Sequence, residues 1–216
     1  DISGNYSVTL VDLDGQAMAI AQQSQWNNTV NFYKYSSGQW SASDLPALTD
    51  NNYVTDVKLI SFGGKTFVSY VSVDEYSSYG HVKVLENNTW KEITDSSSQN
   101  IGKVDNNQLD MGVAGGKLYI SYVNNKILYV REITVGNSSV QFGEAKNIAS
   151  SNDFLSAPRV LSQSGNLYIV YKEGNTIYLT PGEGGNKAEA GSASSYDAIT
   201  YNNELYFVSA ISDNLE

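Results

Sequence analysis

Residues 116–122 read Gly-Lys-Leu-Tyr-Ile-Ser-Tyr, a glycine turn followed by an aromatic-rich strand, and this stretch recurs along the 216-residue chain. Residues 64–70 (Gly-Lys-Thr-Phe-Val-Ser-Tyr) and 165–171 (Gly-Asn-Leu-Tyr-Ile-Val-Tyr) are close copies. Weaker copies begin at Gly15 and Asn203. Five copies in succession indicate a repeat architecture that covers nearly the whole chain.

Each copy stands in the same local order of four short strands. An alternating apolar strand precedes it, and a third strand follows after a polar turn. A short fourth strand surrounds an aromatic residue, which is Trp40, Trp90 or Phe142 in the first three copies. Because these aromatics recur at equivalent positions, we predict that they pack within the fold. Four short strands in roughly 45–50 residues are typical of a β-propeller blade.

We therefore predict an all-β fold, a β-propeller of about five four-stranded blades in a single domain over residues 1–214. The blades are placed at residues 6–53, 54–107, 108–154, 155–193 and 194–214, and residues 215–216 are interpreted as a cloning remnant. The fifth blade ends soon after its second strand. It is therefore incomplete, closed by an N-terminal strand, or closed between chains, and exposed strand edges favour self-association. A β-sandwich is the alternative fold.

The order Gly-x-x-Tyr-Val-x-Tyr, polar hairpin, Val-x-Val and Asn-x-x-Trp resembles the β-propeller repeats of bacterial extracellular and cell-surface proteins. The second to fourth copies match this pattern best. The resemblance implies a secreted or cell-surface location, often beside wall-attachment or glycan-binding modules. Those repeats share no catalytic motif, so the resemblance assigns no catalytic residue.

Composition limits the partners and the chemistry. Thirteen Lys and Arg against 23 Asp and Glu give a formal charge of −10, which disfavours nucleic acid and anionic membranes as partners. No apolar run approaches the roughly 18–20 residues that span a bilayer, so we expect no membrane insertion. The chain has no cysteine, which removes thiol catalysis, disulfides and thiolate metal ligands.

The candidate ligand-binding residues lie in the two long loops between second and third strands, at 22–28 and 72–80. Aromatic faces with carboxylates nearby suit a sugar, whose C–H face stacks while its hydroxyls are hydrogen-bonded. The candidates are Trp26, Asp74, Glu75, Tyr76, Tyr79 and His81.

Structural interpretations of the same residues stay open. Trp26 could be tucked against its own blade, and Tyr76 and Tyr79 could form an exposed hairpin tip. His81 has no serine–histidine–acid spacing in the sequence, so a hydrogen-bonded structural role is favoured for it.

The sequence predicts no metal site, no cofactor and no catalytic residue. Zinc is disfavoured by the single histidine. Calcium has weak support from the oxygen donors at 105–110, which we interpret as a turn. Glycoside hydrolysis needs two carboxylates roughly 5–9 Å apart, and Asp56 or Asp74 with Asp110 are the pairs that could meet near the channel.

A further pattern lies six residues before each copy of the repeated strand. The residues there are Thr9, Lys58, Asp110, Arg159 and Asp197. Since innermost strands line a propeller channel, we predict a ring of compensating charges. The alternative is simple exposed charge at strand starts.

The sequence thus predicts a non-catalytic, extracellular bacterial module for adhesion, which binds carbohydrate or a surface protein through the loops of blades one and two. A scaffold or spacer in a larger surface protein is the first alternative. A glycan-active hydrolase that uses paired carboxylates is the second.

Overall fold

The computed structural model describes residues 6–23, 28–105, 108–136 and 139–210, and all the helical or strand structure in these ranges is β-strand. The predicted all-β class is confirmed. Within the same ranges there is no helix long and apolar enough to cross a membrane.

The described residues form five antiparallel sheets in chain order. The first sheet holds β1 (Tyr6–Leu13), β2 (Gln16–Gln23), β3 (Thr29–Ser36), β4 (Gln39–Ala42) and β5 (Leu48–Thr49). The second holds β6 (Tyr53–Phe62), β7 (Lys65–Val73), β8 (Ser78–Glu86), β9 (Thr89–Glu92) and β10 (Gly102–Lys103). The third holds β11 (Leu109–Ala114), β12 (Lys117–Asn124), β13 (Ile127–Val135), β14 (Val140–Phe142) and β15 (Lys146–Ser150). The fourth holds β16 (Leu155–Gln163), β17 (Asn166–Glu173), β18 (Thr176–Pro181) and β19 (Ala188–Ser192), and the fifth holds β20 (Ser195–Tyr201) and β21 (Glu204–Ala210).

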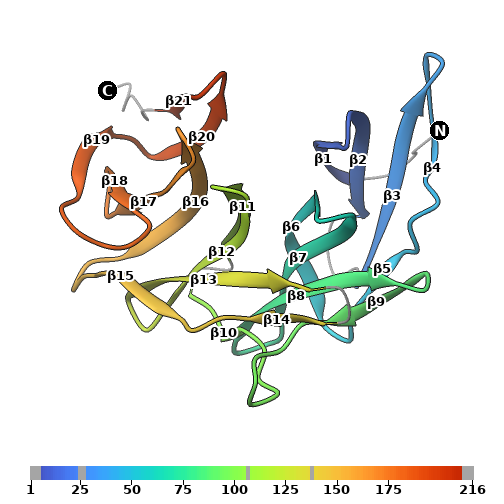
Figure 1. Ribbon diagram of the computed structural model, residues 1–216, viewed down its shortest axis with the longest axis horizontal. Helices are drawn as coiled ribbons and strands as arrows, with labels where there is room; N and C mark the ends of the chain where they lie inside the picture. The colour runs from blue at the N-terminus through green and yellow to red at the C-terminus, as the bar shows by residue number, and fades with distance from the viewer. Residues whose placement is uncertain (1–5, 24–27, 106–107, 137–138, 211–216) are drawn as a thin grey trace.

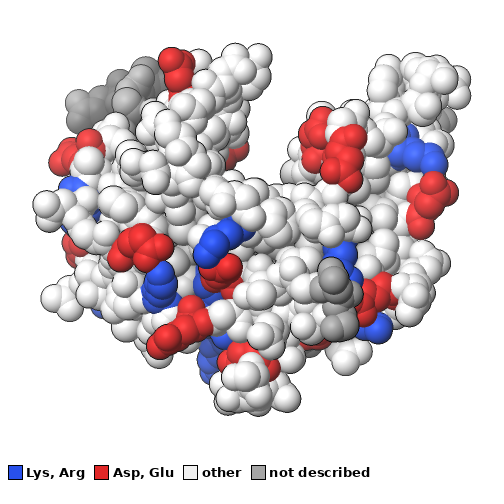
Figure 2. Space-filling view, in the orientation of Figure 1, with Lys and Arg blue, Asp and Glu red and all other residues white. Residues whose placement is uncertain are grey.

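The sheets follow one another around an open ring (Figure 1). The first strands β6, β11 and β16 are neighbours in space, as the inner strands of successive blades are. The ring is open between the first sheet and the fifth, and Figure 2 shows a deep notch at that place. Among the described residues β20 and β21 pair only with each other, and β1 pairs with β2, so the N-terminal strand does not complete the fifth sheet.

The outer edge of each of the first three sheets is divided between two short strands. In the first sheet, β4 covers one end of β3 and β5 covers the other. The third strands β8 and β13 are covered in the same way, by β9 with β10 and by β14 with β15. The sequence predicted β4, β9 and β14 but not their short partners.

The core consists of apolar layers between successive sheets. Most of the buried side chains belong to four such clusters, one at each described junction between sheets. Strand β7 illustrates how one strand contributes to two of these layers. Its residues Phe67 and Val71 pack toward the third sheet, whereas Val68 and Tyr70 pack toward the first. Because the second, third and fourth sheets are covered on both faces, their central strands are nearly continuously apolar.

Inner strands of neighbouring sheets are joined by carboxylates at the channel. Asp56 accepts the N–H of Leu109 at 2.9 Å, and Asp110 accepts the N–H of Val160 at 2.8 Å. Two ion pairs form among the residues of the predicted charge ring, as Lys58 Nζ lies 3.6 Å from Asp110 Oδ1 and Arg159 Nε lies 2.8 Å from Asp197 Oδ1.

One packing prediction holds in two sheets and fails in the first. Trp90 packs against Phe32 of the first sheet with ring centroids 5.8 Å apart, and Phe142 is buried. Trp40 is 45% exposed, because none of the other described sheets packs on its side of the first sheet.

Candidate functional site

A hollow that the described residues line lies between the second and third sheets. It has a volume of about 530 Å³. We call it the loop hollow, and its lining residues are Tyr76, Ser77, Ser78, Lys103, Val104, Asp105, Asn124, Asn125, Lys126, Phe154 and Leu155. These residues come from two hairpins between second and third strands and from two links between sheets, the same end of the repeat where the sequence placed the ligand loops.

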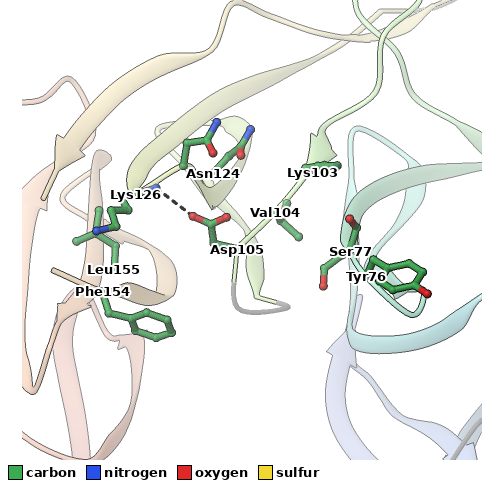
Figure 3. Close-up of a pocket in the computed structure, with 11 residues that line it drawn as sticks. Tyr76, Ser77, Lys103, Val104, Asp105, Asn124, Lys126, Phe154 and Leu155 are labelled. Carbon is green, nitrogen blue, oxygen red and sulfur yellow. Dashed lines mark hydrogen bonds between the residues drawn. The ribbon is translucent and has the colours of Figure 1, made fainter. Parts of the chain in front are cut away.

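Two aromatic side chains stand at opposite sides of the loop hollow (Figure 3). Tyr76 is 85% exposed and Phe154 is 58% exposed. In the view of Figure 3 the Phe154 ring points toward the centre, whereas the Tyr76 ring stands at the rim with its hydroxyl directed outward. Other aromatics of the first and fifth sheets are exposed as well, but Tyr76 and Phe154 are the two aromatics that line the loop hollow.

The hairpin tip that carries Tyr76 is fixed by Asp74. Oδ1 of Asp74 accepts the backbone N–H groups of Tyr76 at 2.8 Å and Ser77 at 2.7 Å. The backbone N–H of Asp74 donates to the Ser77 carbonyl at 3.0 Å. Aspartate commonly closes turns in this way. Asp74 therefore holds the tip in one conformation, and Tyr76 is presented on an ordered turn.

The floor of the loop hollow is braced by polar contacts around Asp105. Its Oδ2 accepts the backbone N–H of Lys126 at 3.0 Å, and its own N–H donates to the Val123 carbonyl at 2.7 Å. Asn125 and Lys126 both have positive φ, the conformation of a tight two-residue hairpin. Lys126 Nζ donates to the Asn152 carbonyl at 2.7 Å, which joins this hairpin to the next link.

The structure separates the predicted ligand residues. Tyr76 lines the loop hollow, while Asp74 supports it from the turn and Glu75 is exposed at the tip. Tyr79 lies in β8 opposite Lys103 of β10, and His81 lies further along β8. Trp26 lies outside the described residues. Phe154 was missed because it falls in a link that lacks the repeat pattern.

Both ring nitrogens of His81 are engaged in hydrogen bonds within the protein. Its Nε2 shares a hydrogen bond with Ser72 Oγ at 2.8 Å, and its Nδ1 donates to Glu92 Oε1 at 3.0 Å. The imidazole also stacks on Tyr70 with centroids 4.8 Å apart. Tyr70 in turn donates its hydroxyl to Asp50 at 2.8 Å.

The order Ser72, His81, Glu92 has the connectivity of a hydrolase triad, which the spacing in the sequence did not reveal. A nucleophile must reach its substrate, and Ser72 is only 2% exposed. The strand register brings the three residues together inside the first-to-second sheet packing. We therefore assign a structural role, and no catalytic role, to Ser72, His81 and Glu92.

Among the acids that the structure describes, Asp56 and Asp110 have raised pKa values. Burial raises the pKa of the Asp110 carboxyl, while Lys58 and Arg159 act against this and Asp56 adds to it. Burial also raises the pKa of Asp56, against the N–H of Leu109 and the charge of Lys58. Each carboxylate already accepts a backbone N–H of the next sheet.

The residues predicted as a weak calcium loop are used for other contacts where the structure describes them. Asp105 binds the Lys126 N–H, and Asp110 belongs to the channel contacts. Residues 106–107 lie outside the described ranges. Within those ranges there is no group of three or more His, Asp or Glu side chains placed to hold a metal ion.

No protein-family model matches the chain, and no curated protein sequence matches it. Solved structures do match. The lectin of Aleuria aurantia in complex with α-methyl-L-fucoside gives a TM-score of 0.63 at 15% identity, over 96% of this chain and 71% of the lectin. A second structure of that lectin, described as a six-bladed β-propeller, gives a TM-score of 0.58 at 14% identity, over 96% of this chain and 71% of the lectin.

An enzyme also has a similar fold. Xylan β-1,4-xylosidase from Bacillus halodurans gives a TM-score of 0.57 at 14% identity, over 94% of this chain and 48% of the enzyme. The chain thus spans about half the length of that xylosidase. These likenesses confirm that the fold of this chain is of the β-propeller type.

Proposed function

We propose that this chain binds carbohydrate through the loop hollow and does not hydrolyse it. The observation that carries the proposal is the pair of exposed aromatics, Tyr76 and Phe154, on either side of a polar floor. A sugar can stack its C–H face on such rings and hydrogen-bond its hydroxyls to amide and carboxylate groups such as Asn124 and Asp105. That one β-propeller of similar fold is a fucoside-binding lectin supports the ligand class.

The charges of the loop hollow refine the ligand class. Lys103 and Lys126 line it beside a single acid, Asp105, although the chain as a whole carries a formal charge of −10. The hollow is therefore locally cationic by count. We propose that it prefers glycans with a carboxylate or sulfate group over neutral ones.

Binding is favoured over hydrolysis by the arrangement of the acids. Asp105 is the one carboxylate among the described lining residues, whereas glycoside hydrolysis uses two across the sugar. The second candidate function, hydrolysis at the channel, is favoured by the raised pKa values of Asp56 and Asp110. It is disfavoured because Asp110 is buried and its two oxygens face Lys58 and the Val160 N–H.

A glycan array tests the proposal, with neutral and acidic sugars and a Tyr76→Ala, Phe154→Ala double variant. We expect the wild type to bind and the variant to lose at least about tenfold in affinity, which corresponds to roughly 1.4 kcal/mol. Phe207→Ala is the matched control, because Phe207 is an exposed aromatic in β21 of the fifth sheet and does not line the hollow. Equal binding by wild type and double variant would contradict the site.

The catalytic alternative is tested by incubating bound glycans with the protein and measuring new reducing ends. We expect none. Hydrolysis that is lost in Asp110→Asn would replace the binding proposal with an enzyme. A wild type that folds but binds no glycan would favour the scaffold role.

The proposal includes an extracellular location on a bacterial surface, in an adhesive role. It is supported by the resemblance of the repeat to the blades of bacterial surface proteins. The measurement that checks it is detection of the parent protein in the surface fraction of its source cells.

A further inference from the structure

Two sheet faces at the opening of the ring carry exposed apolar side chains. The leading face is the side of the first sheet turned away from the second, with Val8, Leu10, Tyr35 and Trp40. The trailing face is the side of the fifth sheet turned away from the fourth, with Asp197, Ile199, Tyr206 and Val208. The seven apolar and aromatic side chains named here are exposed, and the first and fifth sheets border the notch in Figure 2.

The repeat shows what the leading face normally packs against. Leu10 stands at the strand position that Leu59, Met111, Val160 and Ala198 hold in the later sheets. Each of those four is buried in the apolar cluster that joins its sheet to the preceding one. Leu10 is 69% exposed. The leading face is thus a sheet-to-sheet contact surface that no described sheet covers.

The outer strands of the first sheet also indicate that the leading face is a contact surface for another sheet. Trp90 packs on Phe32 of the preceding sheet and donates its indole N–H to the Pro46 carbonyl at 2.9 Å. Trp40 holds the equivalent position in the first sheet, and its described ring partner is Tyr35 of the same sheet, at 5.2 Å. Within the described ranges no sheet covers Trp40 as the first sheet covers Trp90.

The trailing face is the complementary surface. Val208 holds the position of Ile20, Ser69, Ser121 and Val170, all of which are buried. Tyr206 holds the position of Met18 and Phe67, which pack into the cluster shared with the following sheet. Val208 is 73% exposed. The chain therefore carries one uncovered face of each kind.

The inner strands supply a polar contact of matching geometry. Asp110 pairs with Lys58 on one side and accepts the Val160 N–H of the following sheet on the other. Asp197 pairs with Arg159 on the preceding side in the same way. Leu10 is paired with Ala19 in the register in which Val160 is paired with Ile169, so its N–H is directed to the channel. An Asp197 to Leu10 N–H bond would repeat the Asp110 to Val160 bond.

We propose that a second copy of this chain covers these faces, with the trailing face of one copy packed on the leading face of the next. At each described junction between sheets, a leading face meets the trailing face of the sheet before it, so the two uncovered faces fit each other and neither fits itself. The contact is heterologous: it joins two different surfaces, so each copy keeps one face of each kind for further copies. The proposal does not depend on glycan binding.

The test is sedimentation velocity of the wild type and of two charge variants, Leu10→Asp and Val208→Asp, with circular dichroism to confirm folding. The wild type should associate as its concentration rises. Each variant alone should be monomeric, because every contact needs one intact face of each kind. A mixture of the two variants should form a 1:1 complex that grows no further, since Leu10→Asp keeps its trailing face and Val208→Asp keeps its leading face.

Three outcomes would overturn the proposal. One is a wild type that stays monomeric at every concentration reached. Another is a single variant that still self-associates, which would indicate that a face pairs with itself. The third is a mixture of folded variants that forms no complex. Tyr76→Ala is the control and should associate as the wild type does, which separates this result from the loop hollow.

Discussion

The last position of the repeated strand shows how one residue type serves two environments. Tyr70 and Tyr171 occupy this position in the second and fourth sheets, and both are fully buried. The Tyr70 hydroxyl donates to Asp50, and burial together with that bond raises its pKa. The Tyr171 hydroxyl is buried with no hydrogen-bond partner among the described residues. The aromatic ring is buried at both positions, but only the Tyr70 hydroxyl makes a hydrogen bond among the described residues.

Phenylalanine substitutions should separate these two hydroxyls. Tyr70→Phe removes a bond to a charged acceptor and should lower the free energy of unfolding by about 1–2 kcal/mol. Tyr171→Phe removes a buried hydroxyl without a partner, so stability should stay within about 0.5 kcal/mol of the wild type or rise. Urea denaturation of both variants measures this. Equal losses in the two would show that Tyr171 has a partner after all.

At the scale of the element, the inner strands are tied by charge as well as by packing. The channel carboxylates reach across from β6 to β11 and from β11 to β16. Gly112 makes the approach of β11 and β16 close, since a Cβ there would lie 2.9 Å from Val160. The inner strands are thus joined by close backbone packing and by hydrogen bonds from backbone N–H groups to Asp56 and Asp110.

Stability should depend on pH through Asp110. Its raised pKa means that the folded chain holds this proton more tightly than the unfolded chain, so its contribution to stability grows as pH falls through the raised value toward about 3.9. Asp110→Asn cannot take up the proton but still accepts from Val160. From about pH 7 to about pH 4.5 we expect the free energy of unfolding of the wild type to rise relative to the variant. A difference independent of pH would contradict the assignment.

Strands with a long alternating or apolar pattern could be predicted from the sequence, and the others could not. The strands around 67, 120 and 169 stand out because each is buried on both faces. The two-residue strands β5 and β10 carry no such pattern, as they are defined by pairing with β3 and β8. Local sequence does not encode a pairing this short.

Some residues of the candidate site could likewise be predicted from the sequence, and others could not. Tyr76 was found because a long loop with aromatics is visible in the sequence. Phe154 enters the site only when the third and fourth sheets are placed side by side. The contact of Ser72 and Glu92 with His81 likewise depends on the registers of β7, β8 and β9, which the spacing does not state. Trp40 and Trp90 looked equivalent, and only the open ring distinguishes them.

At the scale of the whole molecule, charge opposes the association proposed here while apolar faces favour it. Each copy carries a formal charge of −10, and like charges repel over roughly the Debye length. The contact faces themselves are largely apolar. The balance between these two effects is therefore adjustable with salt.

Self-association should strengthen as salt rises from about 0.05 M to about 0.5 M, because the Debye length falls below about 5 Å while apolar burial is retained. Sedimentation equilibrium at the two salt concentrations measures this. Glycan binding should respond in the opposite direction if the ligand is acidic, since its attraction to Lys103 and Lys126 is screened. Association that weakens with salt would indicate a contact dominated by ion pairs.

The divided outer edges also affect whether the sheets of different molecules can pair edge to edge. A continuous rim strand would offer a long row of free N–H and C=O groups, the template on which sheets of different molecules fuse. Here the rims of the first three sheets are made of pieces such as β5, β9 and β14, each two to four residues long and offset from the next. Such a rim gives a foreign strand no continuous register to extend. The rims of the first three sheets are thereby protected from edge-to-edge strand pairing between molecules, whereas β21 of the fifth sheet is a continuous seven-residue strand that pairs only with β20 among the described residues.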